Sequence, residues 1–286
     1  MDLFLVNVLS GLTYGMLLFL MASGLSIVFG LMRIINLAHG SFFLFGSYVA
    51  YAMVSRGMNF WLALIITIVI VMILAFVVER FLISRFHGNE ASQVLLTIGL
   101  IFIIGDVSLW LWGGDFLSIP VPAIFDFSFA IGSSSFPIYR LFVIAIGVLC
   151  TILLWYFETK TKVGMIVRAG VDDMEMVGAL GFNIKAIFLS VFLFGAALAA
   201  LGGVLSGPIL GMYPKMEFEI LVNSLVIVLI GGLGSWKGAF LGAILIGLVD
   251  SFGKIYLPDV ASLLIFAVMV LVLIFKPTGL FGRVES

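Results

Sequence analysis

Long apolar stretches separated by short polar breaks set the pattern of this chain. Because the hydrocarbon core of a bilayer is about 30 Å thick, a helix needs about 20 apolar residues to cross it. Six stretches reach or approach that length: Leu3–Phe29, Phe60–Ile83, Gln93–Trp112, Ile138–Phe157, Ile184–Leu205 and Ser262–Phe275. Three are shorter: Ser41–Val54, Ile220–Ile230 and Ala239–Val249. The pattern predicts an all-α polytopic membrane protein with eight or nine membrane segments, of which the short ones are half-length, tilted or re-entrant.

Two polar breaks, residues 33–41 and 231–238, interrupt apolar regions in the two halves of the chain. Irregular backbone at membrane depth is tolerated only where protein or a water-filled cavity satisfies its polar groups. Paired interruptions in the two halves of a transporter point to the substrate route. The alternative is that both breaks are ordinary cytoplasmic turns. The route candidates are Asn36, His39, Gly40, Ser41, Gly232 and Gly234.

One carboxylate falls in the middle of an apolar stretch. An ionisable side chain inside a membrane segment is costly and is a functional-site hypothesis by default. Asp106 in I-I-G-D-V is therefore a further route candidate, with a buried, hydrogen-bonded structural role as the alternative. Asp250 closes another apolar stretch and is expected at the outer interface.

The segment Glu158–Lys185 is a polar island between two spanning stretches. We expect a short surface helix over Val167–Leu180, with its acidic residues in one turn and a Gly-x-x-Gly break at its end. Such an element can seat in a groove of another protein, since helix-in-groove docking is a recurrent mode of recognition. The alternative is a solvated connector. The docking candidates are Arg168, Asp172, Asp173, Glu175, Gly178 and Gly181.

The distribution of Lys and Arg orients the segments, because cytoplasmic loops carry an excess of cations. If the polar island is cytoplasmic, ten of the fourteen cations lie inside and four lie outside. The inside set is Arg33, Arg80, Arg85, Lys160, Lys162, Arg168, Lys185, Lys237, Lys276 and Arg283; the outside set is Arg56, Arg140, Lys215 and Lys254. The loop at about 113–137 is then extracytoplasmic, and the C-terminus is inside.

Composition excludes several classes of protein. The chain is 63% hydrophobic and 10% charged, against about 45–50% and 25% in soluble domains. We expect one membrane domain over residues 1–286, with the first apolar stretch retained because no basic region precedes it. A net charge of −1 gives no reason to expect nucleic acid. The single cysteine, Cys150, excludes disulfides within the chain, and His39 and His87 lack partners at metal-ligand spacing.

Catalytic and nucleotide-binding motifs are missing from the sequence. The phosphate-binding pattern G-x-x-x-x-G-K-[ST] does not occur, and neither does a nucleophile or zinc-protease motif. We therefore expect no enzyme activity and no cofactor on this chain. If ATP drives transport, ATP and magnesium must bind to other subunits.

Four blocks resemble a known family. Residues 33–40, R-I-I-N-L-A-H-G, with G-S-Y at 46–48, resemble the R-x-I-N-F-A-H-G…G-A-Y signature of LivH-type permeases of branched-chain amino acid ABC importers. Residues 168–183 resemble the coupling loop of that family, and residues 194–204 and 231–239 resemble two further blocks. Leu37, Phe182 and Asp250 depart from its common residues Phe, Ile and Glu.

The resemblance implies a permease subunit in the bacterial inner membrane. It implies as partners a LivM-like second permease, two ABC ATPase subunits and an extracytoplasmic substrate-binding protein. The implied cargo is branched-chain or other hydrophobic amino acids, with urea or short amides as the alternative within the superfamily. A stand-alone transporter driven by an ion gradient is the alternative from another class.

Overall fold

The computed structural model describes residues 2–32, 36–86, 89–132 and 134–282. Arg33, His87 and Arg283 lie outside these ranges, so the expectations that involve them are not addressed. The longest helices are α1 (Asp2–Met32), α3 (Phe60–Phe81), α4 (Glu90–Trp112), α5 (Ile138–Lys160), α8 (Ile184–Leu210) and α10 (Trp236–Tyr256). The shorter elements are α2 (His39–Val54), η1 (Ile83–Phe86), η2 (Ala123–Phe125), β1 (Ser128–Ile131), β2 (Ser134–Pro137), α6 (Lys162–Asp172), α7 (Met174–Ala179), α9 (Met216–Gly231), η3 (Pro258–Val260) and α11 (Ala261–Phe275).

The architecture confirms an all-α polytopic membrane protein. Seven helical segments of the described chain are long and apolar enough to cross a bilayer. Two more helices, α2 and α9, have 16 residues each and fall short of a full crossing. The seven and the two give nine, within the predicted range. The described strands form one antiparallel hairpin, in which Phe129 faces Phe136.

One predicted half-length segment is in fact a full-length helix. The prediction Ala239–Val249 stopped at the first charged residue, whereas α10 runs on through Asp250 to Tyr256. The charge is tolerated because Lys254, one turn later, lies 2.7 Å from the Asp250 carboxylate. An ion pair at spacing i, i+4 stabilises a helix instead of ending it.

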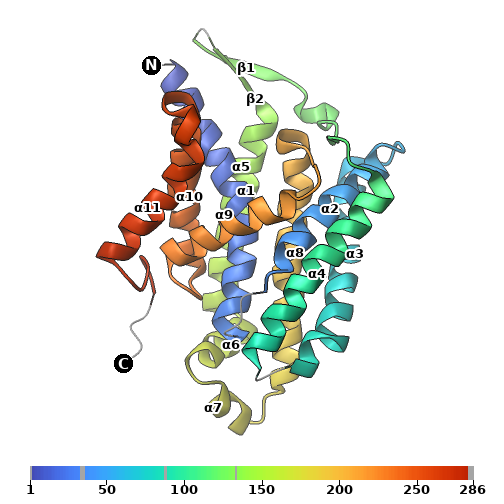
Figure 1. Ribbon diagram of the computed structural model, residues 1–286, viewed down its shortest axis with the longest axis vertical. Helices are drawn as coiled ribbons and strands as arrows, with labels where there is room; N and C mark the ends of the chain where they lie inside the picture. Colours follow the sequence, from blue (N-terminus) through green and yellow to red (C-terminus); the bar gives the residue numbers. More distant parts are fainter. Residues whose placement is uncertain (1, 33–35, 87–88, 133, 283–286) are drawn as a thin grey trace.

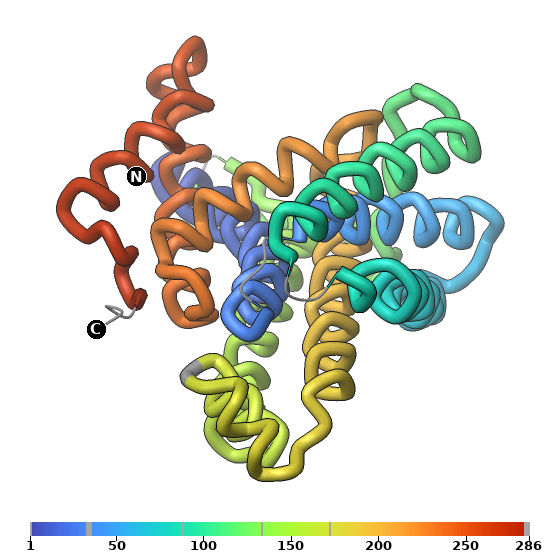
Figure 2. Tube along the Cα trace, turned by 60° about the horizontal axis from the view of Figure 1, so that its bottom comes forward, coloured from blue at the N-terminus to red at the C-terminus, as the bar shows by residue number. Residues whose placement is uncertain are grey.

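Helix α1 lies at the centre of the molecule and contacts α10, α8, α5 and α9 (Figures 1 and 2). Glycines allow this close packing: a Cβ on Gly15 would lie 2.6 Å from the carbonyl oxygen of Ala243, and a Cβ on Gly247 would meet the backbone of Gly11. Small residues that let backbones approach are the usual means of packing helices in membranes. Gly11 and Gly15 therefore allow α1 and α10 to pack closely.

Helix α9 crosses the middle of the molecule, between the end that carries β1–β2 and the end that carries α6 and α7 (Figure 1). It begins at Lys215, whose φ of 73° is the only left-handed value of a non-glycine residue in the described chain. Before this turn, Met212 exchanges two backbone hydrogen bonds with Leu117 of the 113–137 loop. The start of α9 is thereby tied to the hairpin end of the molecule.

Candidate functional site

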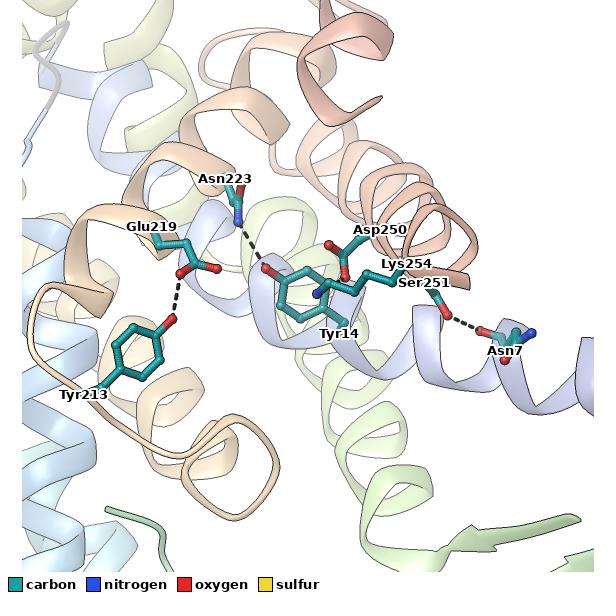
Figure 3. A network of polar contacts seen from close by, with 8 residues as sticks. All are labelled: Asn7, Tyr14, Tyr213, Glu219, Asn223, Asp250, Ser251 and Lys254. Carbon is teal, nitrogen blue, oxygen red and sulfur yellow. Dashed lines mark hydrogen bonds and ion pairs between the residues drawn. The ribbon is translucent and has the colours of Figure 1, made fainter. Parts of the chain in front are cut away.

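A row of polar side chains runs along α9 and across to α1 and α10 (Figure 3). We call it the polar strip. Its members are Tyr14, Tyr213, Glu219, Asn223, Asp250 and Lys254. They come from three helices and from the turn before α9, and long apolar stretches surround all of them in the sequence.

Tyr14 joins the two sides of the polar strip. Its hydroxyl accepts a hydrogen bond from the Asn223 amide nitrogen at 3.1 Å. Its ring lies 5.3 Å from the Lys254 ammonium, which also pairs with Asp250. Near the α10 end, the hydroxyl of Ser251 donates to the Asn7 carbonyl at 2.8 Å. These contacts join α1, α9 and α10.

At the other end of the strip, Glu219 accepts a hydrogen bond of 2.6 Å from the Tyr213 hydroxyl. Glu219 and Val222 are exposed and their spacing puts them on one edge of α9, and Lys215, the N-cap residue just before the helix, is exposed as well. Exposed charges on a helix that packs among membrane-spanning helices face water or protein, because a lipid environment is costly for them. This edge of α9 therefore faces a water-filled route or another protein.

The polar side chains of the first break are buried and are not members of this strip. Asn36, His39 and Ser41 are 3%, 1% and 1% exposed. The His39 ring is packed between α1 and α8, where a Cβ on Gly24 would lie 3.0 Å from its Nε2 and one on Gly195 3.4 Å from its Cε1. Within the described chain, the Asn36 amide, the His39 Nε2 and the Ser41 hydroxyl have no hydrogen-bond partner. These three side chains are buried between helices, and their place on the substrate route stays a prediction.

Gly40, at the start of α2, packs against Glu217 of α9, whose carboxylate is buried. A Cβ on Gly40 would meet the Glu217 carbonyl oxygen and would lie 3.0 Å from the Leu221 Cβ. Glu217 itself is 3% exposed, and its Oε1 lies 2.5 Å from where a Cβ on Gly105 would be. Glycines on α2 and α4 therefore make room for α9.

Asp106 is the neighbour of Gly105 on α4, and its side chain is exposed. The alternative of a buried, hydrogen-bonded structural carboxylate is therefore wrong. The nearby rings of Phe102 and Phe218 lie 5.4 Å apart, which places this part of α4 beside the start of α9. Its role as a route residue stays a prediction.

The second polar break is a tight turn between α9 and α10. Gly232 and Gly234 have φ values of 98° and 78°, a backbone region open mainly to glycine. A Cβ on Gly234 would lie 2.9 Å from the Gly30 Cα at the end of α1. The backbone N–H groups of Leu280 and Phe281 donate to the last carbonyls of α9 at 2.8 and 2.9 Å. These contacts explain both glycines by packing, and a role on the substrate route remains untested.

A cavity of about 1220 Å³ opens beside this turn, between the ends of α1, α5, α6 and the segment after α11. Arg168, one of the predicted docking residues, lines it together with Gly234. Across it, Glu158 accepts a hydrogen bond of 2.9 Å from the Trp236 indole and lies 3.5 Å from the Lys237 ammonium. The structure thus brings the polar island and the second break to one place.

The polar island contains two helices and not the single helix predicted over Val167–Leu180. The backbone of Asp173 is extended, with φ −152° and ψ 101°, and its carboxylate caps α7 by accepting the Met176 N–H at 2.9 Å. An aspartate at this position favours a helix start over a helix interior. Asp172 therefore ends α6 while Glu175 lies in α7, so the three acidic residues do not share one turn.

The predicted glycine break is confirmed by the backbone. Gly181 has φ 87°, and its N–H donates to the Gly178 carbonyl at 3.0 Å just after α7 ends. Asp173 and Glu175 are exposed, and so are the apolar side chains of Met176 (58%) and Leu180 (69%). Helix α7 presents an apolar contact set with charges beside it.

Sequence reasoning did not identify the strip: it named Asp250 and Lys254 separately, as an interfacial carboxylate and an outside cation, and it missed the other four residues. Tyr14 and Asn223 are 209 positions apart, and no local pattern links them. One signal was available: Lys215 and Glu219 frame the start of the short stretch Ile220–Ile230. Charges next to a membrane segment that is too short to cross indicate a functional edge.

Comparisons with known proteins agree on one family. The model of the family described as branched-chain amino acid transport system / permease component matches residues 7–273. The permease LivH of Salmonella typhimurium is 30% identical over 99% of this chain and 96% of its own length. The permease LivM of Escherichia coli is 24% identical over 94% of this chain and 68% of its own length. Both are named as proteins of a high-affinity branched-chain amino acid transport system.

A solved structure shares the fold. PsaBC from Streptococcus pneumoniae, in complex with a Fab, aligns with a TM-score of 0.51 over 95% of this chain and 92% of that chain. Its sequence identity of 12% supports a common fold and nothing finer. With the family match extending over nearly the whole length, the chain belongs to the permease-component family of branched-chain amino acid transport systems.

Proposed function

We propose that this chain carries branched-chain or other hydrophobic amino acids across the bacterial inner membrane, as the LivH-like permease subunit of an ABC importer. The observation that supports the proposal is the polar strip. It ends at Glu219 on the exposed edge of α9, and an exposed charge among membrane-spanning helices suits a water-filled route. The names of its LivH and LivM relatives support the cargo class.

A second permease subunit completes the route. The chain is similar to both LivH and LivM, which supports pairing with a LivM-like protein. The exposed edge of α9 is open on one side in the single chain, so a partner must shield its charges from lipid. An extracytoplasmic binding protein delivers the amino acid to the hairpin end.

The energy comes from two separate ATPase subunits, which hold ATP and magnesium. Within this sequence no phosphate-binding loop of the common type occurs. Helices α6 and α7 form the docking surface, with Met176 and Leu180 as its exposed apolar contacts and Arg168 next to the cavity. Movement of this surface changes the cavity between α6 and the α9–α10 turn, and so reaches α9.

Uptake by the assembled complex tests this proposal. The chain is produced with its partner subunits in vesicles loaded with ATP, and entry of labelled leucine is followed against excess urea or acetamide. We expect uptake to require ATP, to resist ionophores and to be unaffected by either competitor. Loss of uptake with an ionophore while ATP is present would favour the ion-coupled transporter. Competition by urea or acetamide would favour the alternative cargo.

A further inference from the structure

The exposed edge of α9 combines three kinds of chemistry within two helical turns. Glu219 supplies a carboxylate that the Tyr213 hydroxyl orients at 2.6 Å. Lys215 supplies an ammonium group four positions earlier, and Val222 adds an apolar surface that is 40% exposed. Half-buried Phe218 lies between them on the same edge.

The two charges of this edge are not paired with each other. Within the described residues, no cation lies within 4.0 Å of Glu219, and no carboxylate lies that close to Lys215. Asp250 and Lys254 differ, because they already form an ion pair of 2.7 Å. Lys215 is attracted by the buried Glu217 carboxylate nearby but forms no ion pair with it, so Lys215 and Glu219 both remain able to bind a ligand with an anionic and a cationic group.

We infer that this edge of α9 recognises the charged head of a zwitterionic amino acid. Glu219, oriented by Tyr213, takes the α-ammonium group, and Lys215 takes the α-carboxylate. Val222 and Phe218 line the side on which an aliphatic side chain lies. The inference rests on the proposed function and deepens it, since it assigns the discrimination between amino acids and neutral cargoes to named residues.

The chemistry separates the two cargo classes. Hydrogen bonds in which a partner is ionised are about twice as strong as those between neutral groups. Urea and short amides bring no charge, so they leave Glu219 and Lys215 without a counter-charge in a partly dehydrated route. Lys215 at the N-cap and Glu219 in the first turn of α9 are four positions apart, and the flexible four-carbon stem of lysine lets both charges reach one small zwitterion.

A charge-selective labelling experiment tests the inference. The complex with its permease and ATPase partners is purified without the binding protein, from a Cys150→Ser, Val222→Cys chain. Thiol reagents of equal size with a positive or a negative charge are compared. We expect the cationic reagent to react faster, and Glu219→Gln to lower the ratio of the two rates about tenfold, the size expected for one unit charge a few ångströms away. Glu90→Gln, an exposed carboxylate at the start of α4, is the matched control and should leave the ratio unchanged.

Substrate protection is the second readout. Saturating leucine should slow the labelling severalfold while urea and acetamide do not, and Lys215→Asn should abolish the protection by leucine. Asparagine is chosen because it tolerates the left-handed backbone of this position. Assembly with the partners shows that each variant has folded.

Three results would overturn the inference: equal rates for both reagents, no reaction at position 222, or protection by urea equal to that by leucine. No reaction would mean that this edge is buried against the second permease. These results do not test leucine uptake by the Cys150→Ser chain. The proposed function is tested separately, by the uptake measurement in vesicles loaded with ATP.

Discussion

The glycine at position 40 decides how closely α2 and α9 approach. Its Cα faces the Glu217 carbonyl, and an added methyl group would lie 3.0 Å from the Leu221 Cβ. Overpacking of this kind typically costs about 1–3 kcal/mol. We expect Gly40→Ala to lower the thermal stability of the purified complex. Gly99→Ala is the matched control, because a Cβ at this position of α4 meets nothing within 4 Å; equal stability of the two variants would contradict the packing assignment.

Asn36 tests whether the buried first break serves transport. A buried polar group without a partner costs about 1–3 kcal/mol, so replacing it by an apolar residue of similar size does not lower stability on packing grounds. Both polar atoms of the Asn36 amide lack a partner in the described chain. We expect Asn36→Leu to assemble normally and to lower leucine uptake. Normal uptake by a normally expressed variant would show that Asn36 has no role on the substrate route and that residues 36–41 serve the structure only.

Among the elements, α7 carries the proposed contact with the ATPase. Gly178→Trp, the obvious bulky variant, is a poor test because a Cβ at Gly178 already lies 2.8 Å from Ile184 Cδ1 at the start of α8. Met176→Asp with Leu180→Asp changes only exposed side chains. We expect this double variant to insert in the membrane and to lose its ATPase subunits on purification. Glu90→Gln, an exposed carboxylate at the start of α4 and outside the docking surface, is the control, and co-purification of the ATPase with the double variant would show that α7 is a connector.

The elements also show what the sequence could and could not predict. Hydropathy located the membrane segments because length and apolar content alone determine a crossing. It cut α10 short at Asp250, since the ion pair with Lys254 that sustains the helix is a property of the folded turn. The sequence predicted one helix where the structure has α6 and α7, because the sequence alone does not show whether Asp173 caps a helix or continues one. The strip on α9 needed tertiary contacts such as that between Asn223 and Tyr14.

At the scale of the whole molecule, the two ends differ in charge and shape. The end with α6 and α7 carries four of the predicted inside cations, Lys160, Lys162, Arg168 and Lys185, and the opposite end carries the hairpin and the 113–137 loop (Figure 1). We expect cysteine at position 173 in a Cys150→Ser chain to react only with a membrane-permeant reagent in intact cells. A cysteine at Asp115, in the other loop, should react with an impermeant one. The reverse labelling pattern would show that the predicted orientation is wrong.

The central position of α1 sets a requirement on the order of events during synthesis. This helix is synthesised before α5, α8, α9 and α10, which surround it in the folded chain, so it can meet lipid before they arrive. Its sequence must therefore suit two solvents in turn: hydrocarbon at first, and closely packed protein afterwards. Small apolar residues satisfy both, because glycines such as Gly11 and Gly15 expose no polar side chain to lipid and still admit the backbone of α10 when it arrives. A charged side chain at the centre of α1 would therefore be disfavoured in lipid, even if the folded protein offered it a partner of opposite charge.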